Sequence, residues 1–183
     1  MAGSGESDCI RQLFDRDKGA NRVSMITDSL AAAVGVWNEE GPPSFPIDRS
    51  DIRRWAIATH WPHEPPRLYW DEDYANATRW GGIIAPEDFN PFTWPVTRSD
   101  DGPTRYVMPS PGEPGQRMLN GGVAFQFVQP MRPGDVIRGR WRIKDATERE
   151  GRFGQMLYIQ LERQLHNQRD ELIRTRVDTV IRY

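Results

Sequence analysis

The chain has 183 residues and a formal charge of -2, with 24 lysines and arginines against 26 acidic residues. This balance creates no overall field that would attract nucleic acid or an anionic membrane. An apolar fraction of 37% suits one globular domain with a single core. No apolar run approaches the roughly 20 residues that span a bilayer. We therefore expect a protein with neither nucleic-acid nor membrane partners.

The cysteine content and the first residues bear on location. Cys9 is the single cysteine, so no internal disulfide can form. The opening MAGSGESD is small, polar and acidic, and it lacks the basic and then apolar pattern of a secretory signal. A cytoplasmic protein is the simplest expectation.

The first half of the chain has the apolar spacing of helices. Residues 8–38 show this spacing, with Ser24 as the expected N-cap. A helix is expected over residues 48–58. A proline-rich loop follows, and then a short helix at residues 71–78. Later in the chain, a loop-rich region contains one short expected strand at residues 106–108.

The second half alternates between apolar and polar residues. Period two is typical of an antiparallel sheet with one wet face. The helical first half is the material available to cover the apolar face. We therefore expect the α+β class, with helices first and a curved antiparallel sheet afterwards. The alternating segments are residues 123–128, 137–144, 157–165 and 173–183, separated by turns at 130–135, 148–154 and 167–171.

Three stretches, in this order, resemble one family. They are LYWDEDYA at residues 68–75, TRWGGIIAP at 78–86, and LNGG at 119–122 followed by PMRPGDVI at 130–137. Together they are similar to the MaoC-like dehydratases. The resemblance is closest to the N-terminal-half type found beside a catalytic half in acyl-thioester dehydratases and R-specific enoyl-CoA hydratases.

The resemblance implies a single hot-dog fold over residues 45–183, with residues 1–44 as an N-terminal helical extension. In a hot-dog fold an antiparallel sheet wraps around a central helix, which would come from the Gly81–Trp94 region. The family pairs two hot dogs, so it implies either a homodimer or a heterodimer with a catalytic MaoC-like chain.

The implied reaction is the reversible elimination of water from a 3-hydroxyacyl thioester. It needs a base for the Cα proton, an acid for the leaving hydroxyl, and backbone N–H groups for the thioester oxygen. Coenzyme A or carrier-protein pantetheine would be part of the substrate. The resemblance implies no separate cofactor and no metal.

The family's catalytic Asp/His pair, in the motif GDxNPxH, is not intact here. Tyr69 stands where the histidine would be, and a phenol with a pKa near 10 is a poor base at neutral pH. Counting back from Tyr69 places Glu64 at the aspartate position. Counting forward from Trp55 places His60 or Trp61 there. Both alignments remain open.

One loop nevertheless carries acid/base chemistry. His60, His63 and Glu64 could act as acid and base if the fold brings them together. The alternative is an ordinary surface loop stiffened by prolines. A second motif is also altered, since Pro86 has no N–H where catalytic members have a histidine. The residues expected to bind substrate are Tyr69, Gly81, Gly82, Ala85 and Asn120.

We therefore predict a component of a 3-hydroxyacyl-thioester dehydratase or enoyl-CoA hydratase. In one version the chain is a non-catalytic half that shapes the tunnel for a catalytic partner. In the other it forms a homodimer and uses His60, His63 and Glu64. The alternatives are an acyl-thioester-binding or assembly module without chemistry, and a hot-dog thioesterase.

Overall fold

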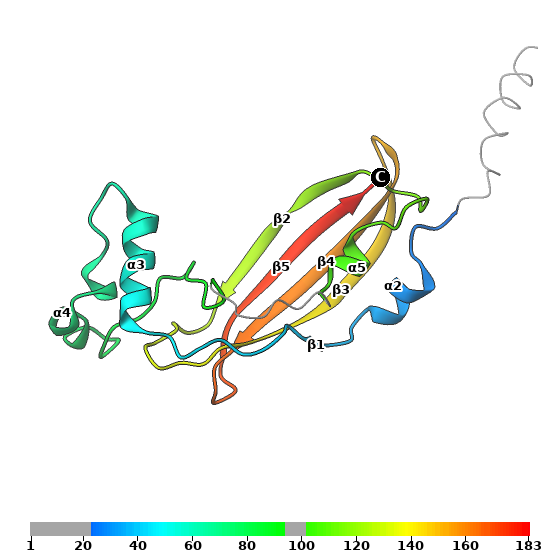
Figure 1. Cartoon of the computed structure of the whole chain (residues 1–183). Coiled ribbons are helices and arrows are strands. Elements are labelled where there is room, and N and C mark those ends of the chain that lie inside the picture. Colours follow the sequence, from blue (N-terminus) through cyan, green and yellow to red (C-terminus); the bar gives the residue numbers. More distant parts are fainter. Residues whose placement is uncertain (1–22, 94–101) are drawn as a thin grey trace, which may run out of the picture.

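The computed structural model describes residues 23–93 and 102–183, which contain one five-stranded antiparallel sheet (Figure 1). Its spatial order is β1-β3-β4-β5-β2. The four long strands confirm the four alternating segments of the sequence. The strands are β1 (Asn38–Glu39), β2 (Met118–Phe127), β3 (Arg138–Gly151), β4 (Gly154–His166) and β5 (Leu172–Arg182).

Two of the expected helices are confirmed, and each begins at an aspartate. These are α3 (Arg49–His60) and α4 (Glu72–Asn76). The Asp48 carboxylate accepts the Ser50 N–H at 2.7 Å, and the Asp71 carboxylate accepts the Tyr74 N–H at 3.0 Å. Each cap satisfies a backbone donor that the first turn leaves unpaired.

Other local expectations were wrong. The N-cap of α2 (Asp28–Ala33) is Thr27, whereas Ser24 donates a hydrogen bond to the Glu148 carboxylate at 3.1 Å. The short strand expected at residues 106–108 is instead the end of a one-turn helix, α5 (Thr104–Val107). The helical spacing of residues 8–22 lies outside the described residues.

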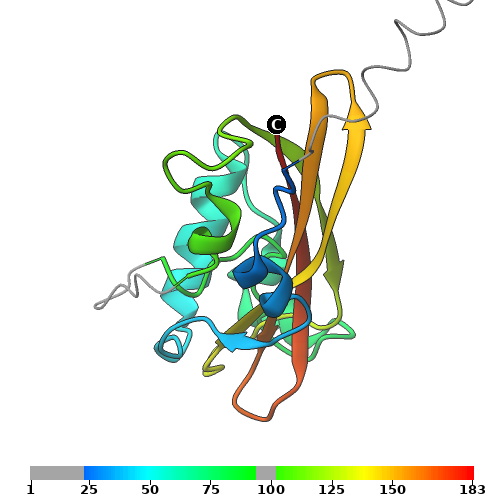
Figure 2. The ribbon, with the colours of Figure 1, turned by 90° about the vertical axis from the view of Figure 1, so that its right-hand side faces the viewer.

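The helix expected from the Gly81–Trp94 region is not formed, since residues 81–93 contain no helix. Pro86 and Pro91 cannot donate the hydrogen bonds that a helix would need there. The longest described helix, α3, lies beyond one end of the sheet and not along its length (Figure 1). Figure 2 shows α2, α3 and α5 on one side of the sheet.

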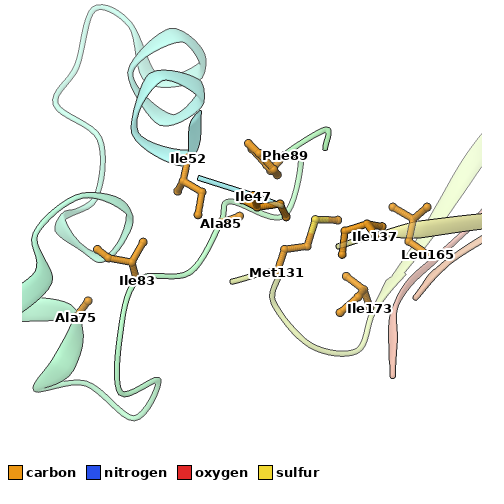
Figure 3. Packing of buried hydrophobic residues seen from close by; sticks show 10 residues of the cluster. All are labelled: Ile47, Ile52, Ala75, Ile83, Ala85, Phe89, Met131, Ile137, Leu165 and Ile173. Atoms are coloured by element: carbon orange, nitrogen blue, oxygen red, sulfur yellow. The ribbon is translucent and has the colours of Figure 1, made fainter. Parts of the chain in front are cut away.

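Two apolar clusters hold the helices to the sheet. In the first, α2 and α5 cover the middle of β3 and β4, where Trp141, Ile143 and Ile159 are at most 1% exposed. The second lies at the end of the sheet, where α3, α4 and the loop after Gly82 meet the strand ends (Figure 3). Its members are Ile47, Ile52, Ala75, Ile83, Ala85, Phe89, Met131, Ile137, Leu165 and Ile173.

The segment before residue 45 adds to the same sheet. Asn38 and Glu39 of β1 pair with Trp141 and Arg140 of β3, and α2 packs on β3. The domain boundary near residue 44 therefore stays a prediction. Of the described helices, none is long and apolar enough to cross a bilayer.

Strand β2 lies at the edge of the sheet, and the described residues leave it uncovered. It pairs with β5 on one side, and nine of its ten residues are exposed. Val123, Phe125 and Phe127 are 49%, 47% and 42% exposed. The expectation that helices cover the whole apolar face is therefore wrong for this strand.

Candidate functional site

A pocket of about 660 Å³ opens where the end of α3 faces the ends of β2 and β5. Its walls come from residues 59–60, 68–69 with 79–80, 84–88, and 127–131 with 173–174. The second apolar cluster fixes these segments, because Ala85, Met131 and Ile173 belong to both the cluster and the wall.

A second, smaller pocket of about 480 Å³ adjoins the first. The two share Leu68, Arg79 and Trp80. Arg79 is exposed, and its guanidinium lies 4.4 Å from the centre of the Trp80 ring. The shared rim therefore combines an aromatic surface with a positive charge.

Of the three residues expected to act as acid or base, the structure places only His60 in the pocket. It ends α3, and its Nδ1 lies 2.9 Å from the Ala56 carbonyl oxygen. His63 and Glu64 are exposed and do not line the pocket. The structure thus places one member of the predicted cluster in the pocket, and the catalytic role of all three stays a prediction.

Tyr69 also lines the pocket, and its ring lies 6.0 Å from that of His60. Burial raises the pKa of the Tyr69 phenol, and the charges of Glu87 and Asp88 raise it further. The phenol therefore keeps its proton at neutral pH. It can donate a hydrogen bond to a ligand, but it cannot remove a proton from a carbon acid.

The loop at residues 84–88 offers backbone donors. The Ala85 N–H is already used, because it donates to the Met131 carbonyl at 2.8 Å. Pro86 has no N–H. The N–H groups of Glu87 and Asp88 donate to no group within the described parts of the chain. These two groups, rather than that of Ala85, are available to a ligand oxygen.

Arg174 in β5 is a pocket residue that the sequence reasoning did not select. Its Nη1 donates a hydrogen bond to the Glu87 carbonyl at 2.7 Å. Burial lowers the pKa of this guanidinium, and neighbouring Arg176 lowers it further. Alternation along residues 173–183 placed Arg174 among the charged residues of the wet face. No local signal distinguishes it from its solvated neighbours.

Comparison with known families identifies the chain. Residues 32–176 match the model of the family described as FAS1-like, dehydratase domain region. This match spans most of the 183 residues. The chain belongs to the MaoC-like dehydratase family. The resemblance found in its motifs is therefore confirmed, and so is the dehydratase or hydratase type of the family.

Solved structures confirm the MaoC-like hot-dog fold. The ChsH1-ChsH2 complex from Mycobacterium tuberculosis matches with a TM-score of 0.67 at 15% identity, covering 88% of this chain and 97% of that one. A MaoC-like dehydratase from Rhodospirillum rubrum matches with a TM-score of 0.55 at 20% identity, covering 82% and 92%. The HadBC 3R-hydroxyacyl-ACP dehydratase complex from Mycobacterium tuberculosis also scores 0.55 at 20% identity, covering 81% and 96%. At these identities the likeness shows the fold. Among curated proteins, no significant match is found.

The remaining residues expected to bind substrate in this MaoC-like chain lie outside the pocket. Gly81 and Gly82 have φ angles of 61° and 151°, so this turn requires glycine for its backbone conformation. The Asn120 side chain accepts the Gly122 N–H at 2.8 Å, at an irregularity in β2. Their role in binding stays a prediction. Within residues 23–93 and 102–183, no cluster of His, Cys, Asp and Glu could hold a metal ion.

Proposed function

We propose that this chain is the non-catalytic half of an acyl-thioester dehydratase or hydratase. Its partner would be a catalytic MaoC-like chain that supplies the Asp/His pair. The reaction would be the reversible elimination of water from a 3-hydroxyacyl thioester, with coenzyme A or carrier pantetheine as part of the substrate.

The observation that carries this proposal is the state of the single imidazole in the pocket. The described partners of the His60 ring are the Ala56 carbonyl and the Thr59 hydroxyl, and neither is a carboxylate. An imidazole without an acidic partner lacks the paired groups that elimination of water requires. The pocket carboxylates of Glu87 and Asp88 are exposed and form no hydrogen bond with it.

The pocket is better suited to holding a thioester than to moving its protons. The N–H groups of Glu87 and Asp88 donate to no described residue and can donate to a carbonyl oxygen of the ligand. The protonated Tyr69 phenol is a further donor. Apolar side chains of Ile84 and Phe127 would contact an acyl chain.

The exposed edge strand β2 supports the proposal that a partner chain binds this one. Edge strands expose unpaired backbone N–H and C=O groups, and proteins usually protect them with charges or proline. Residues 118–127 contain neither. Phe127 both ends β2 and lines the pocket, so a chain docked on β2 would also close the pocket. Among the similar structures, the ChsH1-ChsH2 and HadBC proteins are themselves complexes.

The first test is hydration of crotonyl-CoA by the purified chain, followed as loss of the enoyl absorbance. We expect the chain without a partner to bind crotonyl-CoA without turning it over. Adding a catalytic MaoC-like chain from the same cell should raise the rate about 100-fold or more, the size of an acid/base contribution. Robust hydration by the chain without a partner, lost in His60→Ala, would contradict the proposal and favour the homodimer that uses its own histidine.

Two further outcomes would favour the alternative functions. Release of free coenzyme A from an acyl-CoA, detected with a thiol reagent, would indicate a thioesterase. Binding that never leads to hydration, whichever catalytic chain is added, would indicate a binding or assembly module.

The second test concerns the partner surface. Phe125→Asp replaces an exposed aromatic ring of β2 by a charge and should weaken the complex at least tenfold, because the apolar contact is lost and burying a charge at an interface is costly even opposite Arg176. Phe153→Asp is the matched control, since Phe153 is 49% exposed in the β3–β4 turn. Equal affinity of both variants for the catalytic MaoC-like chain, measured by calorimetry, would refute β2 as the partner surface.

A further inference from the structure

Arg174 is the feature of the pocket that the proposed function does not use. It stands on β5, opposite Leu165 of β4 and Phe127 of β2, and is half-buried. One of its N–H groups donates to the Glu87 carbonyl. No Asp or Glu of the described residues pairs with it within 4.0 Å. Four of its five donors are therefore without a partner from these residues.

An arginine in this position is costly to maintain. Burial lowers its pKa, Arg176 acts in the same direction, and the charge of Asp88 opposes them only in part. A cation partly withdrawn from water and only partly compensated by an opposite charge destabilises the folded chain. The next residue along the wall, Ile173, is 3% exposed, and Met131 is 4% exposed. An anionic ligand in this pocket would complete the compensation that Asp88 supplies only in part.

The geometry favours a carboxylate. A guanidinium is a planar fork that matches the two oxygens of a carboxylate. Arg174 also donates to the Glu87 carbonyl, in the same loop that carries the Glu87 and Asp88 N–H groups offered to the thioester oxygen. The coenzyme phosphates have a separate candidate at the exposed rim, in Arg79. The inner cation is thus placed to contact the acyl part of the substrate.

We propose that Arg174 determines specificity by binding a carboxylate carried by the acyl group, so that the preferred substrates are thioesters of dicarboxylic acids. This inference rests on the proposed function, because it takes the pocket to be a thioester site. The Glu87 carbonyl holds the guanidinium in place, and a neutral acyl chain would leave its charge unpaired.

The test compares two acyl-CoA probes of equal acyl length by calorimetry with the full chain. Glutaryl-CoA ends in a carboxylate and pentanoyl-CoA in a methyl group, whereas their coenzyme phosphates are identical. We expect glutaryl-CoA to bind about tenfold to 100-fold more tightly, the range for hydrogen bonds to charged groups. Arg174→Met should abolish this preference and leave the affinity for pentanoyl-CoA within about twofold. Arg174→Lys should keep an intermediate preference, because lysine retains the charge but not the fork.

Arg138→Met is the matched control, since Arg138 is an exposed arginine of β3 outside the pocket. It should keep the full preference for glutaryl-CoA. If Arg174→Met fails to fold, as judged by circular dichroism, the wild-type preference and the lysine variant decide the question.

Other results would overturn the inference. Equal affinity of the wild-type chain for both thioesters would refute a carboxylate site while leaving the thioester pocket intact. A loss of affinity in Arg174→Met that is just as large for free coenzyme A would show that Arg174 binds a phosphate instead. If the wild-type chain binds neither thioester, the proposed function itself fails, and the inference fails with it.

Discussion

Strands β4 and β2 alternate in the same way along the sequence but have different surroundings. In β4 the apolar residues Leu157 and Ile159 are 0% exposed, because the strand lies between β3 and β5 and beneath α2 and α5. In β2 the corresponding face carries Val123 and Phe125, which are 49% and 47% exposed. Alternation therefore identifies a strand and its apolar face. What covers that face depends on neighbours that are distant in sequence or belong to another chain.

The largest expected difference is in stability. Ile159→Ala should lower the free energy of unfolding by about 2–5 kcal/mol, because it leaves a cavity in a fully buried site. Phe125→Ala should lower it by about 1 kcal/mol or less, since the ring is half exposed and loses mainly its stacking on Phe127. Urea denaturation of the isolated chain measures both. A comparable loss in the two variants would mean that β2 is packed against this chain's own residues.

For polar residues on the same two strands, we expect a smaller difference between the losses of stability on substitution. Glu162 of β4 is 7% exposed, accepts a hydrogen bond from Arg142 Nε at 2.7 Å, and forms an ion pair with Nη2 of the same guanidinium at 2.6 Å. Glu162→Ala removes the carboxylate partner of that guanidinium, and the free energy of unfolding should fall by about 1–3 kcal/mol. Gln126→Ala on exposed β2 should change it by about 0.5 kcal/mol or less. If both changes are equally harmless, the Arg142–Glu162 pair contributes no more to stability than an exposed one.

The smallest effect concerns the end of β4. Burial, and then the charge of Arg140, lower the pKa of His166 below its ordinary value of 6.5. As the pH falls below about 6.5, the unfolded chain binds the proton before the folded chain does, so the free energy of unfolding should decrease. His166→Gln should remove part of this dependence of the free energy of unfolding on pH, measured by urea denaturation between about pH 7.5 and 5.5. His63→Gln, in an exposed loop, is the control. If His166→Gln leaves the pH dependence of the free energy of unfolding unchanged, His166 does not cause it.

In the pocket, too, some features could be predicted from neighbouring residues in the sequence, whereas others depend on tertiary contacts. Its helix α3 could be predicted because Asp48 caps it and its apolar residues have helical spacing. The family motif likewise led to the loop at residues 84–88. The central helix was expected from the resemblance, although Pro86 and Pro91 already argue against it locally. It was not predictable that His60 lines the pocket and His63 does not, since this depends on where the chain leaves α3.

Taken by itself, the sequence determined the four long strands, the capped helices and the MaoC-like family, because periodicity, caps and motifs act over a few neighbouring residues. The tertiary structure decided which side chains meet. It brought Arg174 to the Glu87 carbonyl across 87 positions of the sequence, and it left β2 at the open edge of the sheet. Contacts of this range depend on how strands are ordered in space, which alternation within a single strand does not specify.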